Sequence, residues 1–458
     1  MYRNNPSVCV ISYLKYVMTV FFAFLPCLAL ANEGIISHYD NGKYVLNPDK
    51  TNTETWEKLA LDKNLQTISF MSFHSWSITP EQIRSLEELT HIQSIVLIGC
   101  KNVNVELLTV LKKLPKLHSL AIFYCQHYSN EVYNELASMT NLDTLSINGE
   151  LISVKGMVCL SKMVNLTQLE IDTSTEVSLQ QIEALQNLKN LRILVIKNVP
   201  ISDFSLQLLG KIHSLKELYL CGFNQGSLTS TFTSKPVLLD EHADRQTEAI
   251  PAFPSNFIPV TERGIQGLAS LKNLQVLALS LPSATTKGEL ESLFTLSSLK
   301  RLALCGVYRD VDINNIQKLT NLQELYLGSS FITGAALKPL AKLQQLREIK
   351  LEFAPDAPEV SKELALLSPL KLRLISLSGN ACVSNLAVDA LSKYLSLEYI
   401  DLYDTDVTSD GINELARVFP NASIFPEPER SESSESIENV PEADKSDFDE
   451  KEEKVGEF

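Results

Sequence analysis

Leu322-Gln-Glu-Leu325-Tyr-Leu327 decides the fold, because its pattern L-x-x-L-x-L returns along the chain. With Ile accepted for Leu, and Phe once at the last position, the pattern occurs thirteen times. Neighbouring copies lie 23 to 27 residues apart, except for one interval of 59. A period of this length predicts a repeat protein whose units stack on one another. The copies begin at Leu65, Ile92, Leu117, Leu142, Leu166, Leu191, Leu215, Leu274, Leu299, Leu322, Leu346, Leu372 and Leu397.

Each unit combines a strand with a helix. Its first part alternates apolar and other residues, as at Leu218 and Leu220, which is strand periodicity. Its second part places apolar residues three apart, as at Leu337, Leu340 and Leu343, which is helix periodicity.

The starts of the helices are marked by capping residues. Thr79-Pro80-Glu81-Gln82 supplies an N-cap, a proline in the first turn and a capping-box partner. The same slot recurs in six further units, at Ser153, Ser178, Ser202, Thr261, Thr333 and Thr408.

The array over residues 65–425 resembles leucine-rich repeat proteins of the helical, ribonuclease-inhibitor-like type. Thr405–Leu415 and Thr333–Ala341 resemble segments of bacterial exported or effector members. The resemblance implies an α/β solenoid of about thirteen repeats, with a parallel sheet on its concave face and helices on its convex face. Strands stack about 4.8 Å apart whereas packed helices need about 8–10 Å, so the stack must curve into a horseshoe. Proteins of this family mostly serve as binding platforms.

The N-terminal region is expected to direct export. Arg3 and Lys15 precede an uncharged run over residues 16–30, and Ala29-Leu30-Ala31 fits a cleavage site, so residues 1–31 are interpreted as a signal peptide. An uncleaved membrane anchor is the alternative, although the run is shorter than the roughly 20 residues of a membrane span. Residues 32–64 are expected to cap the first repeat, with a helix near Trp56.

Two segments depart from the repeat. The long unit beginning at Leu215 contains an insertion at about residues 223–259, which we expect to leave the solenoid as a loop that either contacts a ligand or is a neutral spacer. Residues 426–458 form an acidic tail, and from Glu427 onward it holds 13 acidic and 4 basic residues. Such a composition predicts disorder.

Charge and motifs argue against several functions. The net charge is −15, and no basic face is expected that could match a phosphate backbone, so we expect no nucleic-acid partner. No catalytic or phosphate-binding motif is present, the seven histidines never stand at metal-ligand spacing, and no cofactor is expected. Asp406–Gly411 resembles the start of a calcium loop, but the twelfth position is Arg417 where a Glu is required. We therefore expect neither catalytic nor metal-binding residues.

The cysteines are expected to be free and buried. Removal of the signal leaves six, and Cys100 and Cys125 occupy the ninth position of adjacent repeats. The resemblance to leucine-rich repeat proteins implies that this position holds Asn or Cys, turned inward to bond to neighbouring backbone. A disulfide between these two cysteines is conceivable. Asn380 fills the same position later in the array.

The concave face should carry the third, fifth and seventh residues of each motif, because the leucines point inward. Tyrosines and acidic residues there suit a protein interface. The tyrosine and acidic residues predicted to bind a partner, with one lysine among them, are Glu217, Tyr219, Glu324, Tyr326, Glu348, Lys350, Glu352, Tyr399, Asp401 and Tyr403. A second, apolar zone offers Met71, Val96, Ile98 and Phe123.

The sequence thus favours a monomeric, non-enzymatic platform that is exported, either to the periplasm or outside the cell, and binds a protein partner on its concave face. One alternative is a secreted bacterial effector or adhesin that acts on host proteins. Another is a structural protein of the cell envelope, which would contact the membrane if the N-terminal segment is not cleaved.

Overall fold

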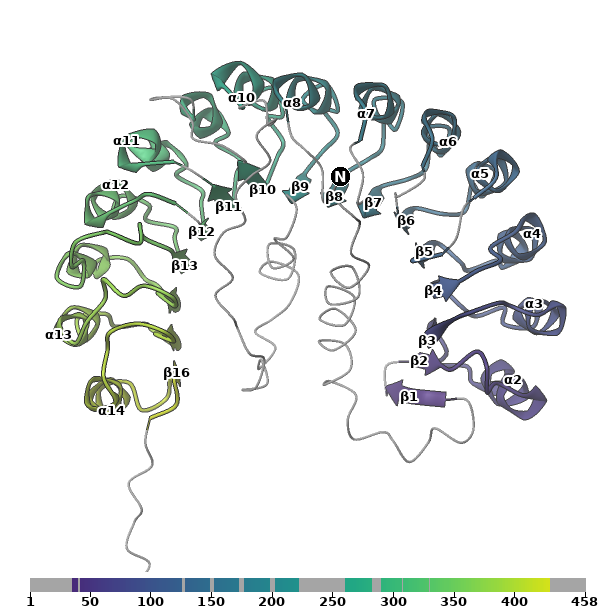
Figure 1. The fold of residues 1–458 in the computed structure, drawn as a ribbon, viewed down its shortest axis with the longest axis horizontal. Coiled ribbons are helices and arrows are strands. Elements are labelled where there is room, and N and C mark those ends of the chain that lie inside the picture. The colour runs from purple at the N-terminus through teal and green to yellow at the C-terminus, as the bar shows by residue number, and fades with distance from the viewer. Residues whose placement is uncertain are drawn as a thin grey trace, which may run out of the picture.

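The computed structural model describes residues 35–39, 42–125, 128–148, 152–172, 177–197, 202–221, 260–281, 290–306, 308–328 and 330–428. These residues form one curved solenoid, with strands lining the inside of the arc and helices the outside (Figure 1). The expected horseshoe is confirmed. The signal peptide, the insertion proposed at 223–259 and nearly all of the acidic tail lie outside the described residues.

A single sheet holds sixteen strands in chain order, and all are parallel except the first pair. The register aligns the repeats: Leu325 of one motif lies beside Leu302 of the preceding one and Ile349 of the next. The strands are β1 (Ile35–Tyr39), β2 (Lys43–Leu46), β3 (Thr67–Trp76), β4 (Ser94–Cys100), β5 (Ser119–Phe123), β6 (Thr144–Asn148), β7 (Gln168–Asp172), β8 (Ile193–Lys197), β9 (Glu217–Cys221), β10 (Val276–Leu281), β11 (Arg301–Gly306), β12 (Glu324–Gly328), β13 (Glu348–Leu351), β14 (Leu374–Ser376), β15 (Tyr399–Asp401) and β16 (Ser423–Phe425).

Helices cover the convex side, and in the part of the chain that the structure describes four of them are short 3₁₀ turns. The α-helices are α2 (Thr53–Leu61), α3 (Pro80–Glu87), α4 (Val105–Lys113), α5 (Asn130–Ala137), α6 (Val154–Leu160), α7 (Leu179–Leu185), α8 (Asp203–Leu209), α10 (Glu262–Leu268), α11 (Asp310–Ile313), α12 (Leu337–Leu340), α13 (Leu386–Leu391) and α14 (Ser409–Val418). The 3₁₀ turns are η2 (Glu291–Thr295), η3 (Ile316–Lys318), η4 (Gly334–Ala336) and η5 (Glu363–Leu367).

The leucines of the motif form one hydrophobic core that runs through the stack. Leu322 and Leu327 are completely buried, and Leu325 is 2% exposed. Because neighbouring units share this core, loss of one such side chain to alanine should cost about 2–5 kcal/mol.

The ends of the array contain two parallel strands that the motif does not reveal. β2 pairs with β3, and the helix expected near Trp56 is α2, whose Trp56 and Leu59 cover the first core layer. At the other end β16 pairs with β15, and the Phe425 ring packs on Tyr399 at a centroid distance of 5.3 Å.

The long unit does not interrupt the solenoid. β9 pairs directly with β10, and α8 packs closely on α10. This contact depends on glycine: a Cβ on Gly267 would lie 2.6 Å from Gln207 Cα, and one on Gly210 would lie 2.0 Å from the Gly267 carbonyl oxygen. The units before and after the insertion are therefore neighbours in space.

The helix N-termini carry the expected caps. Capping boxes form at Thr79 with Gln82 and at Ser178 with Gln181, and the hydroxyls of Ser153, Ser202, Thr261 and Thr333 accept backbone hydrogen bonds. Thr408 differs, because its side chain forms no bond within its own helix. Its amide instead donates to Asn385 Oδ1 of the preceding unit at 2.9 Å.

Asp203 and Asp310 form the same kind of link between units. Asp310 accepts from the amide of Thr333 at 2.9 Å and from its hydroxyl at 2.8 Å, and Asp203 accepts both groups of Thr261 at 2.8 and 2.6 Å. Neighbouring helix N-termini are thus tied together through side chains on one rim of the solenoid.

Candidate functional site: the concave face

The concave face is formed by side chains of adjacent strands that the register brings into rows. In the fifth-position row, Val195, Tyr219, Ala278, Ala303 and Tyr326 come from five consecutive strands. The residues predicted to face outward do lie on the side of the sheet away from the leucine core. Their accessibility, however, varies greatly along the arc.

Tyr219 and Tyr326 are packed rather than projecting, with 3% and 5% of their surface exposed. They belong to a second apolar cluster, separate from the leucine core, that also contains the small residues Ala278, Ala303 and Cys305. This burial differs from the prediction that both tyrosines are accessible to a partner. Small side chains between the two rings leave space for them to lie against the sheet.

The position of Tyr326 depends on Gly328. A Cβ at Gly328 would lie 2.4 Å from the Tyr326 hydroxyl, so the ring can extend along its own strand only because residue 328 lacks a side chain. The hydroxyl then donates to Glu352 Oε1 at 2.6 Å, and Lys350 Nζ lies 5.0 Å from the ring centroid. Burial, together with the neighbouring Cys305 and Glu352, raises the pKa of Tyr326.

Tyr219 is satisfied within its own strand in a similar way. Its hydroxyl donates to Glu217 Oε2 at 2.8 Å, and Arg301 of β11 lies 3.8 Å from Glu217 Oε1. Burial, followed by the bond to Glu217, raises the pKa of Tyr219. The sequence did not reveal Arg301 as the partner of Glu217, because these two residues are 84 positions apart.

The C-terminal part of the concave face is acidic and more open. Glu324 and Glu348 are paired neighbours in the register of β12 and β13, and both are half-buried. Burial, and then the adjacent Glu348, raise the pKa of Glu324, while Arg301 opposes this shift. The two like charges on adjacent strands therefore repel each other.

β15 continues this part of the face. Tyr403 is 54% exposed, whereas Tyr399 is half-buried against Phe425. Asp401 accepts a hydrogen bond from Ser376 Oγ at 2.8 Å. Among the predicted tyrosines, Tyr403 therefore presents the most surface to a partner. We define the acidic patch as Glu324, Glu348, Lys350, Glu352, Asp401 and Tyr403.

The apolar zone lies at the other end. Val96, Ile98 and Phe123 are half-buried, and Ile98 and Phe123 are register partners in β4 and β5. Met71 is only 4% exposed and contributes little surface. Between this zone and Tyr219 a polar network crosses three strands, since Glu170 accepts from Ser146 Oγ at 3.1 Å and pairs with Lys197 at 2.5 Å.

The cysteines at the ninth position cap strand ends. Cys125 Sγ lies 3.4 Å from the Phe123 carbonyl oxygen, and both Cys125 and Cys100 are free thiols. Burial raises the pKa of both, that of Cys125 to about 12. Asn380 behaves as expected, because its amide donates to the carbonyl oxygens of Leu351 and Leu377.

Within the described residues, no group of three or more His, Cys, Asp or Glu side chains has the arrangement of a metal site. In the same part of the chain, no helix combines the length and apolar character needed to cross a membrane.

Comparisons with known proteins give distant similarities. No family model matches the chain. A stretch of 99 residues is 34% identical to Receptor like protein 23 of Arabidopsis thaliana, and it covers 21% of this chain and 11% of that protein. The chain thus spans about a tenth of the length of this curated relative.

Three solved structures align over much of the chain. An internalin from Listeria monocytogenes is 18% identical with a TM-score of 0.43, covering 74% of this chain and 81% of its own. A leucine-rich repeat protein of Leptospira interrogans is 16% identical with a TM-score of 0.34, covering 81% and 98%. The yeast complex of Rad7 and Elc1 is 16% identical with a TM-score of 0.49, covering 93% and 98%. The chain's own thirteen motifs, its parallel sheet and its helix-covered convex side establish that it is a leucine-rich repeat solenoid.

Proposed function

We propose that the chain is a non-enzymatic binding protein that engages a protein partner on its concave face, at the acidic patch. The observation that carries this proposal is the pairing of the partly buried Glu324 and Glu348 on adjacent strands, with the exposed Tyr403 two units further along the same face. A cationic side chain of a partner would relieve the repulsion between the two carboxylates, and Tyr403 would add apolar contact with a polar end.

Burial changes which tyrosines are suitable for testing. Replacement of Tyr219 or Tyr326 would disrupt a packed cluster and so would change the fold and the surface together. Tyr403 and Glu348 are the better targets, because Tyr403 is exposed and Glu348 is half-exposed.

The test is affinity capture with a Glu348→Arg/Tyr403→Ala variant. The matched control is Glu414→Arg/Leu395→Ala, which makes the same charge change and removes an exposed apolar side chain away from the concave sheet. We expect the first variant to bind the captured partner about tenfold more weakly or worse, and the control to bind like the unmodified chain. Equal affinities of both variants for the partner would show that the partner does not bind at the acidic patch.

We also propose that the protein is exported, to the periplasm or beyond it, on the basis of the expected signal at residues 1–31. A secreted effector or adhesin and an envelope protein are the alternatives. Mass determination of the N-terminus in fractionated cells distinguishes export from retention in the membrane: a chain beginning near Asn32 in the soluble fraction supports export, and an intact Met1 in membranes contradicts it.

A further inference from the structure

Eleven cations gather on one rim of the solenoid, where each helix leads back into the next strand. They come from seven of eight consecutive helix-to-strand loops, and none of the eight loops contains Asp or Glu. The loops lie at residues 161–167, 186–192, 210–216, 269–275, 296–300, 319–323, 341–347 and 368–373, and the loop at 319–323 contributes no cation. We call this set the basic rim: Lys162, Lys189, Arg192, Lys211, Lys216, Lys272, Lys300, Lys342, Arg347, Lys371 and Arg373. This rim is therefore more basic than the net charge of the chain indicates.

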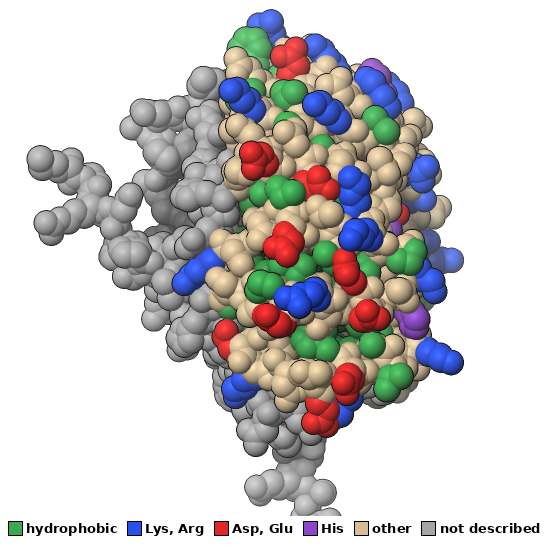
Figure 2. Space-filling view, turned by 90° about the vertical axis from the view of Figure 1, so that its right-hand side faces the viewer, with side chains coloured by type: hydrophobic (Ala, Val, Ile, Leu, Met, Phe, Trp, Pro, Cys, Tyr) green, Lys and Arg blue, Asp and Glu red, His purple; other side chains and the backbone are tan. Residues whose placement is uncertain are grey.

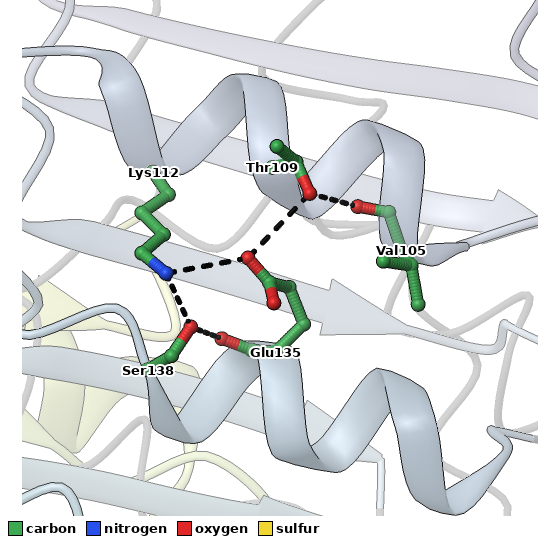
Figure 3. Close-up of polar contacts among 5 residues, drawn as sticks. All are labelled: Val105, Thr109, Lys112, Glu135 and Ser138. Atoms are coloured by element: carbon green, nitrogen blue, oxygen red, sulfur yellow. Dashed lines mark hydrogen bonds and ion pairs between the residues drawn. The ribbon is translucent and has the colours of Figure 1, made fainter.

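The earlier units are different. Lys112 on α4 contacts Glu135 Oε1 at 3.5 Å and Ser138 Oγ at 2.8 Å on α5, so its charge is balanced by the next repeat (Figure 3). Lys113 likewise pairs with Glu87 at 3.1 Å. On the face of the first helices, acidic and basic side chains are interspersed (Figure 2). Of the basic rim, only Arg373 has an ion pair within the described part of the chain, with Glu398 at 2.7 Å.

Five of the rim cations form a row held by backbone hydrogen bonds. Each residue at the second motif position donates its amide to the carbonyl of its counterpart in the preceding unit, at 2.7 to 2.8 Å. The row runs through Arg192, Lys216, Gln275, Lys300, Gln323, Arg347 and Arg373. Strand spacing therefore places neighbouring members about 5 Å apart.

Side-chain amides add a second set of links between these loops. Asn190 Nδ2 donates to the Val164 carbonyl and Asn321 Nδ2 to the Ser297 carbonyl, both at 2.8 Å. The rim is thus an ordered array and not a group of independent lysines.

Helix dipoles explain part of this charge but not the row. Lys211 and Lys272 follow helix C-termini, where a cation is favourable. Arg192, Lys216 and Lys300 stand directly before strands, and most of the row is exposed. Arg192 and Lys216 are direct neighbours in the row, as are Arg347 and Arg373, and such a row of like charges favours a compensating anion.

The chain itself carries a matching anion. From Glu427 onward the tail has a net charge of −9. It follows β16, two strands beyond β14, and leaves the C-terminal edge of the sheet, whereas the rim ends at Arg373 on the N-terminal edge, so the tail must cross the end units to reach the rim. The 30 residues beyond Pro428 can extend roughly 100 Å, whereas eight units of the rim span roughly 35 Å. Because the tail is tethered, its effective concentration at the rim is high.

We propose that the basic rim is a docking surface for the chain's own acidic tail, residues 429–458. The contact is electrostatic and spread over several units, so it weakens as salt rises.

The test is carbodiimide coupling of carboxylates to lysines in the full-length chain, followed by peptide mass spectrometry. We expect links from the tail to Lys189, Lys211 and Lys272 at 50 mM salt, and their loss at 500 mM. A variant with Arg192, Lys216, Lys300 and Arg347 replaced by Gln should reduce the yield at those three lysines about threefold or more. The control replaces Lys101, Lys155, Lys338 and Lys362 by Gln, which are exposed residues outside the rim, and should leave the yield unchanged.

Three results would overturn the proposal. Tail links spread equally over control and rim lysines, unaffected by salt, would show no specific docking. Links found only between light and heavy isotope-labelled chains would assign the tail to a second copy. Absence of tail links, together with protection of the rim lysines by added polyphosphate, would assign the rim to an external polyanion.

Discussion

Replacement of Asp310 by Ala should loosen the junction between two repeats. The carboxylate accepts two hydrogen bonds from Thr333, at 2.9 Å from its amide and 2.8 Å from its hydroxyl, and it lies in the first turn of α11. A hydrogen bond to a charged group contributes about 1.5–3 kcal/mol when buried. Asp310 is half-exposed, so the two bonds together should contribute about 2 kcal/mol.

Asp310→Asn is the matched control. The structure already contains this chemistry at Asn385, whose Oδ1 accepts from the Thr408 amide and whose Nδ2 donates to the Thr408 hydroxyl, both at 2.9 Å. An asparagine at 310 should therefore keep the geometry and lose only the charge at the helix N-terminus, about 0.5 kcal/mol.

Urea unfolding followed by circular dichroism measures the change in free energy, and hydrogen exchange at the Thr333 amide reports the local contact. We expect Asp310→Ala to be the less stable variant and its Thr333 amide to exchange faster. If the alanine variant stays within about 0.5 kcal/mol of the unmodified chain, the link is not stabilising. If the asparagine variant is equally damaged, the charge and not the paired geometry is responsible.

Three further predictions follow from buried groups and close contacts. Glu324→Gln should raise the melting temperature at pH 7, because the raised pKa of Glu324 means that its charge costs stability above that pKa. The gain should vanish near pH 4, where the unfolded glutamate is also protonated. Equal gains in melting temperature at both pH values would contradict this. Cys125, with a pKa of about 12, should be alkylated by iodoacetamide at pH 8 far more slowly in the folded chain than in urea, and equal rates would show an open site. Gly267→Ala should destabilise the chain by about 1–3 kcal/mol in urea unfolding, because the added Cβ meets the backbone of Gln207. Gly334→Ala should cost less stability, because its Cβ meets only the flexible Glu363 side chain at 3.2 Å. The reverse order of stability would refute the packing argument.

The sequence by itself determined the repeat, the strand-then-helix order and the inward position of each motif leucine. These follow from local periodicity, and every unit must bury the same face against its neighbours. It did not reveal β2 and β16, since Lys43–Leu46 and Ser423–Phe425 do not carry the full motif and become strands only by pairing with the array. The short 3₁₀ turns also depend on context.

Tertiary structure alone decided which side chains a partner can reach. Tyr326 is buried because Ala303 and Gly328 leave room for its ring and Glu352 bonds its hydroxyl. Ala303 and Glu352 belong to the neighbouring units, so the motif around Tyr326 does not reveal them. The basic rim arises for the same physical reason. Residues about 24 positions apart in sequence, such as Arg192 and Lys216, have backbones about 5 Å apart when units stack. Periodicity fixes the scaffold locally, whereas accessibility and charge density are properties of neighbouring units brought together.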